Sequence, residues 1–346
     1  MRSSYEVLPL FEEFISDTRK GKLRKANGAP LSIGTVKNYE TVLRLLQAYE
    51  EAASSKLTVR VWKGFNKRLE QTESAYWKRF FKSFSEFVYK RGGFDNYLGM
   101  VIKTLKTFFK YLKKEKHLPI GDFISQLYVF KEDIPVIALS PDRVRYLIYD
   151  TDLRAQLNAV QLKALDIFIF GCAVGLRFSD LVRVTSKDIK KMEGAWYLST
   201  VSKKTKTASL VRLPDYAIDI VKKYQGRSKR IVKLFKAGNL HAFNTALRSI
   251  GEVAGWTEVL GKQRTRNGKT LNVTAASQTR FCDLMSSHLM RRSAITTMLL
   301  AGMPEHLVRK ISGHATNSPS FYRYVNYTQP FLDQAIEKMH DLLKKQ

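Results

Sequence analysis

Cysteine is scarce in this sequence, which has only two among its 346 residues. Cys172 and Cys282 lie in apolar or mixed segments, and neither has partners at the spacing of a zinc site. The six histidines are scattered along the chain. This pattern favours a reduced, cytoplasmic compartment and argues against a structural zinc site.

Long hydrophobic runs are also missing. No segment is apolar over the length that a membrane-spanning helix needs, and the chain does not start with the charged-then-apolar pattern of a signal peptide. With hydrophobic residues at 44%, the sequence is nevertheless apolar enough for ordinary cores, and its length predicts two domains.

Acidic residues are few relative to basic ones. Lysine and arginine number 59 against 31 aspartates and glutamates, which gives a formal net charge of +28. An excess of this size repels itself unless a polyanion neutralises it, and phosphate neutralisation releases counterions. A membrane surface is the weaker alternative, because the basic residues are spread along the whole chain. DNA or RNA is therefore the expected partner.

Residues 1–120 predict an all-helical domain with basic faces. Apolar residues recur at helical spacing, so the aromatic side chains are expected to form its core. The bland alternative for the lysines is a solvated surface, but acidic residues do not balance them. The candidate DNA contacts in this domain are Lys78, Arg79, Lys103, Lys106 and Lys110.

A break without helical period follows, and we predict a linker over residues 121–136. The second domain, residues 137–346, opens on Ser140-Pro141, a typical helix start. An apolar helix over Ala159–Val174 then ends at Gly175. Residues 189–213 predict two short strands around a basic turn.

The rest of the second domain is predicted to be mainly helical. Its exception is a basic hairpin over 264–269, because Asn-Gly fits a tight primed turn. Arg264 and Arg266 of this hairpin are further candidate DNA contacts. A last amphipathic helix is expected over Phe331–Lys345.

One set of residues could handle a phosphodiester. His288 and Arg291 lie three apart, so on a helix their side chains share a face. Further candidates are Arg177 in a Gly-Leu-Arg turn, Lys206 in the first hairpin, and His314 in a Gly-His pair. A cluster of tyrosines follows, at Tyr322, Tyr324 and Tyr327.

In this order, the motifs GLRFSDL, the Lys206 hairpin, SHLMRRS, ISGH and SFYRYV resemble the tyrosine recombinases, the phage-integrase family. RTRNGKT and SSHLMRRS look most like integrases of bacterial conjugative or mobilisable transposons. The resemblance runs from about residue 140 to the end, and the basic front half looks like the family's SAM-like core-binding domain. It implies a mostly α fold with small β-hairpins (α+β), arranged as a two-domain, C-shaped clamp on DNA.

The resemblance also implies roles for the candidate residues. Arg177 and Arg291 would clamp the non-bridging phosphate oxygens, where attack builds up negative charge. The alternative for Arg177 is a structural ion pair with Asp180, an acidic residue that orients the site in the family. His288 and His314 would donate to the phosphate or accept the tyrosine proton.

The leaving 5′ oxygen needs a proton, and the nucleophile needs to lose one. Lys206 stands eight residues before a proline, as the family's general-acid lysine does, and Lys204 is its rival. Tyr324 matches the family's nucleophile best. Tyr322 is the runner-up because the chain carries one extra residue after His314, and Tyr327 is third.

We therefore expect a site-specific recombinase that integrates or excises a mobile element through a 3′-phosphotyrosyl intermediate, without metal or cofactor. Its expected partner is double-stranded DNA at attachment or crossover sites. The protein would form a homotetramer on DNA and could be a monomer in solution, and accessory DNA-bending proteins could take part. The protein would be cytoplasmic and nucleoid-associated, and any arm-binding domain absent or reduced. The last helix could dock on a neighbouring protomer or on its own domain. The alternatives are a non-catalytic DNA-binding regulator and a type IB topoisomerase.

Overall fold

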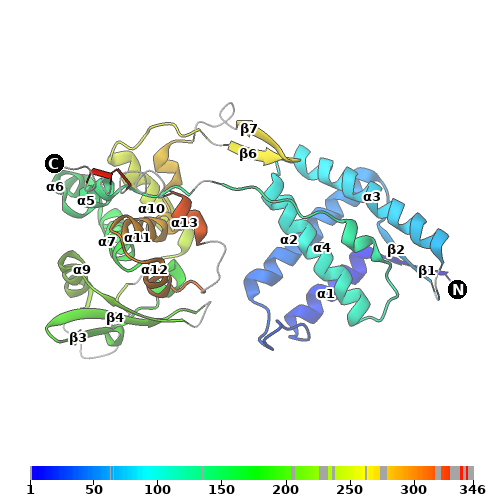
Figure 1. The fold of residues 1–346 in the computed structure, drawn as a ribbon, viewed down its shortest axis with the longest axis horizontal. Helices are drawn as coiled ribbons and strands as arrows, with labels where there is room; N and C mark the ends of the chain where they lie inside the picture. The colour runs from blue at the N-terminus through cyan, green and yellow to red at the C-terminus, as the bar shows by residue number, and fades with distance from the viewer. Residues whose placement is uncertain are drawn as a thin grey trace. The chain divides into compact units, whose positions relative to one another are not determined.

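The computed structural model shows a mostly helical chain with small antiparallel sheets (Figure 1). It describes residues 2–62, 64, 66–134, 136–203, 207–225, 233–235, 238–261, 263–272, 279–315, 321–327, 336–337 and 340–341. The chain forms two compact units, one of residues 1–133 with 263–273, the other of residues 134–262 with 274–346.

The first unit is built on four long helices. Ser32 caps the second of them, where its Oγ accepts a hydrogen bond from the Thr35 amide. The predicted all-helical domain is wrong in one respect, because residues 2–6 and 58–62 pair as antiparallel strands. In chain order the elements are β1 (Arg2–Glu6), α1 (Val7–Arg19), α2 (Ile33–Ala53), β2 (Thr58–Trp62), α3 (Lys67–Lys90), α4 (Asp95–Lys114), η1 (Asp122–Gln126), β6 (Gln263–Arg266) and β7 (Lys269–Asn272).

Aromatic side chains fill the core of the first unit, as their helical spacing predicts. The ring of Trp77 lies 4.8 Å from that of Phe109 and stacks on Phe123 at 5.0 Å. Phe11 and Phe108 join α1 to α4 at 4.8 Å. Each of these large side chains removes much apolar surface from water, which stabilises the packing of the helices.

The first unit extends further along the chain than the predicted domain boundary at residue 120. Ile120, Phe123 and Leu127 are buried in its core, and the unit continues to Asp133. Much of the predicted linker is therefore packed structure. A local helical period could not reveal this, because η1 is a single 3₁₀ turn.

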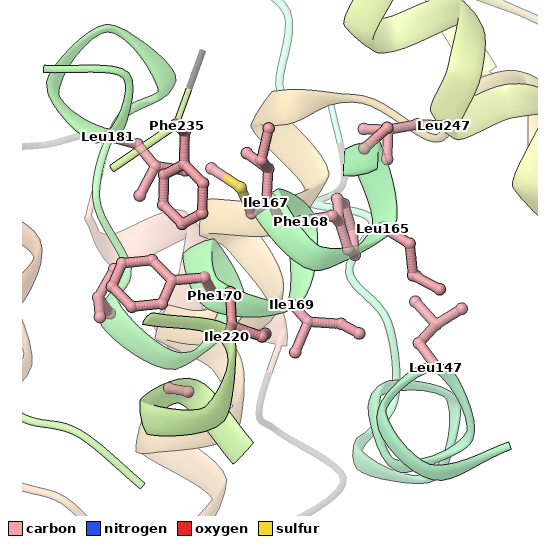
Figure 2. Close-up of a cluster of buried hydrophobic side chains, with 14 of the residues drawn as sticks. Leu147, Leu165, Ile167, Phe168, Ile169, Phe170, Leu181, Ile220, Phe235 and Leu247 are labelled. Carbon is pink, nitrogen blue, oxygen red and sulfur yellow. The ribbon is translucent and has the colours of Figure 1, made fainter. Parts of the chain in front are cut away.

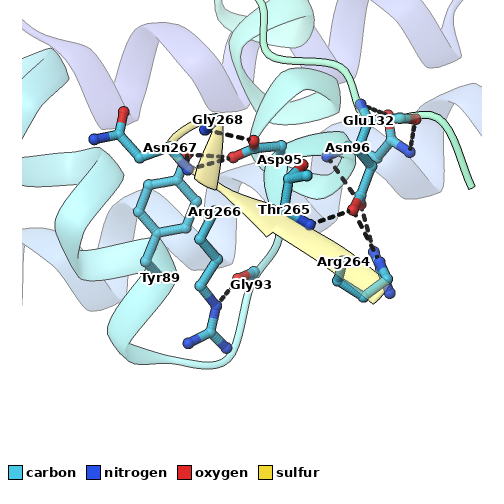
Figure 3. Close-up of polar contacts among 10 residues, drawn as sticks. All are labelled: Tyr89, Gly93, Asp95, Asn96, Glu132, Arg264, Thr265, Arg266, Asn267 and Gly268. Carbon is cyan, nitrogen blue, oxygen red and sulfur yellow. Dashed lines mark hydrogen bonds and ion pairs between the residues drawn. The ribbon is translucent and has the colours of Figure 1, made fainter. Parts of the chain in front are cut away.

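The hairpin β6–β7 also belongs to the first unit, although it lies within the sequence of the second (Figure 3). Asn267 and Gly268 both have positive φ, as the predicted primed turn requires. The buried carboxylate of Glu132 accepts two hydrogen bonds from the Arg264 guanidinium, at 3.0 and 2.6 Å, and one from the Thr265 amide at 2.9 Å. These bonds hold the hairpin against Glu132, and Arg266 donates to the Gly93 carbonyl at 3.0 Å (Figure 3).

A second carboxylate holds the turn of the same hairpin. The two oxygens of Asp95 accept from the backbone amides of Asn267 and Gly268 at 2.8 and 3.0 Å, and Tyr89 donates to the first oxygen. Burial alone would raise the pKa of both Asp95 and Glu132, but these hydrogen bonds lower it overall. Their stabilising contribution is thus present above the ordinary carboxylate pKa and is lost as the pH falls through the lowered values.

Glu132→Ala is expected to loosen the hairpin. Glu132 is 4% exposed, and its loss leaves Arg264 and the Thr265 amide without their acceptor, at a cost of about 2 kcal/mol. The measurement is hydrogen exchange of segment 263–272 together with urea unfolding. Asp142→Ala is the control, because Asp142 forms only an exposed surface pair with Arg145. Unchanged exchange of the hairpin in the Glu132 variant would show that the ion pair does not hold it.

The second unit packs its helices around α7, which is mostly apolar and is buried from Ala164 to Gly171 (Figure 2). Its sheet has three strands in the order β3-β4-β5, where the sequence predicted two. The elements are α5 (Pro141–Tyr149), α6 (Thr151–Gln156), α7 (Ala159–Val174), α8 (Phe178–Leu181), η2 (Ser186–Asp188), β3 (Ile189–Met192), β4 (Ala195–Val201), β5 (Ala208–Arg212), α9 (Asp215–Gln225), α10 (Leu240–Val253), η4 (Phe281–Leu284), α11 (Ser287–Leu300), α12 (Glu305–Ser312) and α13 (Tyr322–Tyr327).

A close approach of α11 to α7 places the second half of the candidate site. A Cβ added at Gly171 of α7 would overlap the Met290 side chain of α11. Glycine therefore allows the two helices to pack closely, next to Arg291. Of the predicted last helix, only residues 336, 337, 340 and 341 are described, and they are helical; the rest lies outside the described residues. None of the helices in the described part combines the length and apolarity that crossing a bilayer requires.

Candidate active site

Arg177 lies directly after the C-terminal end of α7. Gly175 ends that helix with a φ of +67°, and Arg177 then precedes the short helix α8. The Arg177 guanidinium donates from Nη1 to Ser202 Oγ at 3.1 Å and to the Gly313 carbonyl at 3.2 Å. Among the described residues, no carboxylate lies within 4.0 Å of it, so the alternative ion pair with Asp180 is not formed.

Arg291 lies on α11 and is only 4% exposed. Its Nη1 donates to the Gly175 carbonyl at 2.9 Å and to the Ser312 carbonyl at 2.5 Å. These carbonyls belong to the C-terminal ends of α7 and α12, where the helix dipole favours a cation. Burial lowers the pKa of Arg291 to about 10 and the charge of Arg177 acts in the same direction, so Arg291 is protonated at neutral pH.

Together, Arg177 and Arg291 form a cationic centre. Backbone carbonyls accept hydrogen bonds from both guanidiniums, and no described carboxylate lies within 4.0 Å of either. Such a centre suits an anion with several oxygens, because guanidinium groups present fixed donors. A phosphodiester is an anion of this kind.

His314 lies beside Arg291, directly after Gly313, which ends α12 with a φ of +63°. Ser312 Oγ donates to the Val308 carbonyl at 2.6 Å and lies 2.8 Å from His314 Nδ1. Both ring nitrogens of His314 lie near the Arg291 guanidinium, with Nδ1 3.2 Å and Nε2 3.1 Å from Nη2, and the tautomer decides which of them accepts.

His288 occupies the first turn of α11, one turn before Arg291, and its side chain is exposed. The structure thus places the predicted His-x-x-Arg pair on one helix, with the arginine buried and the histidine at the surface.

The tyrosines differ in their surroundings. Tyr324 is half-buried on α13, and its ring centroid lies 5.9 Å from that of His314. It is also close enough to Arg291 to raise the pKa of that guanidinium, opposing burial. Tyr322 is 54% exposed, and its ring lies 4.8 Å from the guanidinium of Arg309. The side chain of Tyr327 lies outside the described residues.

Lys206 and its rival Lys204 also lie outside the described residues. The residues on either side of them are described, and Asp180 holds one of these flanks. Its carboxylate accepts from Ser202 Oγ at 3.2 Å and from the Lys203 amide at 3.0 Å.

Sequence reasoning missed Ser202, Ser312 and the carbonyl acceptors. Only the position of Ser202 just before the basic turn could have pointed to it.

The candidate DNA contacts lie on the first unit. Lys78 and Arg79 of α3 and Lys103 and Lys110 of α4 are exposed, and Lys106 is partly buried. Within the described residues, none of the five has a carboxylate within 4.0 Å, so their charge is not neutralised locally.

The two hairpin arginines differ from each other. Arg264 is neutralised by Glu132 and lies over the Phe94 ring at 4.1 Å, so its DNA contact stays a prediction with a competing partner. Arg266 donates to the Gly93 carbonyl and lies over the same ring, and no carboxylate of the described residues lies within 4.0 Å of it.

Comparison with known families shows the family to which the chain belongs. The model of the phage integrase family matches residues 139–329, more than half of the chain. The chain belongs to the phage integrase family. Its members are the tyrosine recombinases, which act on DNA, and the resemblance given by the sequence motifs is thereby confirmed.

Solved structures agree on the fold of this phage integrase family member. XerH site-specific recombinase bound to palindromic difH substrate matches with a TM-score of 0.59 at 15% identity, over 95% of this chain and 84% of that one. Tn1549 transposon integrase with transposon right end DNA matches with 0.54 at 15%, over 98% and 100%. A lambda integrase dimer on a COC′ core site matches with 0.56 at 12%, over 93% and 77%. A search of curated proteins gives no match. The predicted fold class, mostly helical with small antiparallel sheets, is confirmed.

Proposed function

We propose that this protein is a site-specific DNA integrase that cleaves and rejoins strands through a 3′-phosphotyrosyl intermediate, so that a mobile element is integrated or excised. The observation that carries the proposal is the convergence of Tyr324, His314 and the two arginines, from four separate segments, on one cationic site. A non-catalytic DNA-binding protein would have no need of a tyrosine beside two guanidiniums that no described carboxylate approaches within 4.0 Å.

In the cleavage step, the Tyr324 hydroxyl oxygen attacks the scissile phosphorus while the bond from phosphorus to the 5′ oxygen breaks. The ordinary pKa of a tyrosine hydroxyl is about 10, so attack at neutral pH needs a proton acceptor and a cationic surrounding. His314, whose ring centroid lies 5.9 Å from that of Tyr324, is the proposed acceptor. Lys206 supplies a proton to the leaving 5′ oxygen.

Rejoining is the reverse step on a new strand. A 5′ hydroxyl attacks the phosphotyrosyl phosphorus, the bond to Tyr324 breaks, and the tyrosine regains its proton. One phosphoester replaces another in each step, so the reaction needs no ATP. We propose that it needs no metal or other cofactor either, because Arg177 and Arg291 can stabilise the charge on the phosphate oxygens.

The partner we propose is double-stranded DNA at attachment or crossover sites, bound by four protomers together with accessory DNA-bending proteins. The proposed location of this complex is the nucleoid, in the cytoplasm. Support comes from the net charge of +28 and from the uncompensated basic residues of α3, α4 and β6. Phosphate contacts of this kind position a protein on DNA without reading its sequence. The XerH, Tn1549 and lambda proteins were each solved bound to DNA.

The test of the proposal is covalent trapping. The protein is mixed with nicked suicide duplexes that span the ends of its own element, in EDTA, and the products are separated on a denaturing gel. Because of the nick, the fragment that carries the new 5′ hydroxyl is short and diffuses away, so the covalent intermediate accumulates. We expect a protein–DNA adduct that digestion and mass spectrometry place at Tyr324.

Other outcomes distinguish the alternatives. No adduct on DNA that the protein demonstrably binds would favour the non-catalytic regulator and contradict the proposal. Adduct formation followed only by relaxation or by religation of the same strand, without strand exchange between two duplexes, would favour a type IB topoisomerase.

A further inference from the structure

The loop between β4 and β5 is fastened at its base. Ser202 follows the last residue of β4, and its amide donates to the Thr207 carbonyl at 2.9 Å, one residue before β5 begins. This bond closes a short loop whose middle residues, 204–206, lie outside the described residues. The predicted general acid, Lys206, is one of them.

The Asp180 carboxylate holds the same loop base. One oxygen accepts from the Lys203 amide and the other from Ser202 Oγ, at 3.0 and 3.2 Å. Asp180 is 6% exposed and Ser202 5%, so these bonds are shielded from water. Hydrogen bonds to a buried carboxylate are stronger than neutral ones, and both oxygens are used on this loop.

Ser202 also reaches the phosphate-binding side of the site. Its Oγ accepts from Arg177 Nη1 at 3.1 Å, and the same nitrogen donates to the Gly313 carbonyl. Since a hydroxyl donates one proton and accepts others, it can serve Asp180 and Arg177 at the same time. A Cβ added at Gly313 would lie 3.4 Å from the Ser202 Cβ, so the backbone leaves little room around the serine.

From this geometry we propose that Ser202 is a positioning residue, which ties the general-acid loop to Arg177 through its bonds to Asp180. The inference rests on the proposed function and adds a role to it. The Arg177 guanidinium and the base of the loop that carries Lys206 are thus held by the same hydroxyl. Loss of the Ser202 hydroxyl should therefore impair protonation of the leaving oxygen more than phosphate binding.

The experiment compares two suicide substrates, an ordinary duplex and one with a 5′-bridging phosphorothiolate at the scissile position. A thiolate leaves without a proton, because the pKa of a thiol is several units below that of an alcohol. We expect Ser202→Ala to slow adduct formation on the ordinary duplex by about tenfold or more, and on the sulfur substrate by less than about threefold. The ratio of the two rates is internal to each preparation, so a fraction of misfolded protein does not change it.

Two further variants make the comparison specific. Ser209→Ala removes another buried hydroxyl that joins β4 to β5, through its 3.0 Å bond to Thr200, but reaches neither Asp180 nor Arg177. It should leave the ratio at the wild-type value. Lys206→Ala should show the same sulfur rescue as Ser202→Ala with a larger effect.

Each remaining outcome has a distinct meaning. Equal slowing of Ser202→Ala on both substrates would overturn the inference, since Ser202 would then act only on phosphate binding or folding. Absence of sulfur rescue in Lys206→Ala would overturn both the general-acid assignment and the inference. A wild-type protein that forms no adduct on either substrate would overturn the proposed function itself, together with this role for Ser202.

Discussion

Replacing Tyr324 with phenylalanine is expected to abolish the covalent protein–DNA adduct and leave DNA binding nearly unchanged. The substitution removes only the nucleophilic oxygen. The ring keeps its packing against Phe321 and His314, whose ring centroids each lie 5.9 Å from that of Tyr324. Affinity should change by less than about threefold, because basic side chains supply most of the binding free energy. The measurements are suicide-substrate trapping and a gel-shift titration on the same duplex.

Tyr322→Phe is the matched control. Tyr322 lies on the same helix, two residues earlier, but it is exposed and its ring contacts the Arg309 guanidinium instead of the cationic centre. This variant should form the adduct at the wild-type rate. The opposite result, an adduct in Tyr324→Phe and none in Tyr322→Phe, would keep the tyrosine mechanism and transfer the nucleophile to Tyr322.

The helices of this protein were largely predictable because their signals are local. Ser140 followed by Pro141 marks the start of α5, and the structure confirms the cap, with Ser140 Oγ accepting from the Arg143 amide. The apolar run that ends at Gly175 likewise has the bounds that the sequence predicts, 159–174. Caps, glycines and apolar spacing all act within one or two turns, so the sequence displays them directly.

The strands and the place of the hairpin were less predictable because they depend on distant partners. Arg2–Glu6 pairs with Thr58–Trp62, about fifty residues away, and neither segment forms a hairpin with a neighbour. The Asn-Gly turn of the second hairpin was recognisable, but its attachment to Glu132 and Asp95 was not. Those carboxylates precede the hairpin by more than 130 residues and carry no motif.

The candidate site shows the same division. The order of the motifs predicted Arg177, Arg291, His314 and Tyr324 as site residues, since the proposed chemistry requires such side chains. Their supporting acceptors are mostly backbone carbonyls at helix ends, such as that of Gly175, and every residue has a carbonyl. Which of them reaches an arginine follows only from the packing of α11 against α7.

Arg291→Ala is expected to slow adduct formation by about 10²–10³-fold, the usual loss when a preorganised donor to a developing oxyanion is removed. Arg291→Lys should recover only part of this rate. A lysine is a single ammonium group and cannot reproduce the guanidinium fork, which here donates to the Gly175 and Ser312 carbonyls and lies beside His314. Single-turnover trapping at saturating protein measures the effect on the chemical step.

Arg292→Ala separates this role from a general loss of charge. Arg292 is the next residue on α11, carries the same charge and is more exposed. Its removal should weaken binding slightly, as the loss of one phosphate contact does, and should change the saturated rate by less than about threefold. Equal losses in the two variants would mean that Arg291 contributes only to overall charge.

The burial of Arg291 adds a second, independent consequence. Its pKa is lowered to about 10 by burial and by Arg177, although Tyr324 and Asp180 act in the opposite direction, so at neutral pH the folded protein holds this buried cation at a net cost in stability. A bound phosphate supplies the missing anion and should offset that cost. DNA should therefore raise the melting temperature of the wild type more than that of Arg291→Ala, at equal occupancy. An identical DNA-induced shift in both proteins would indicate that the phosphate does not reach Arg291.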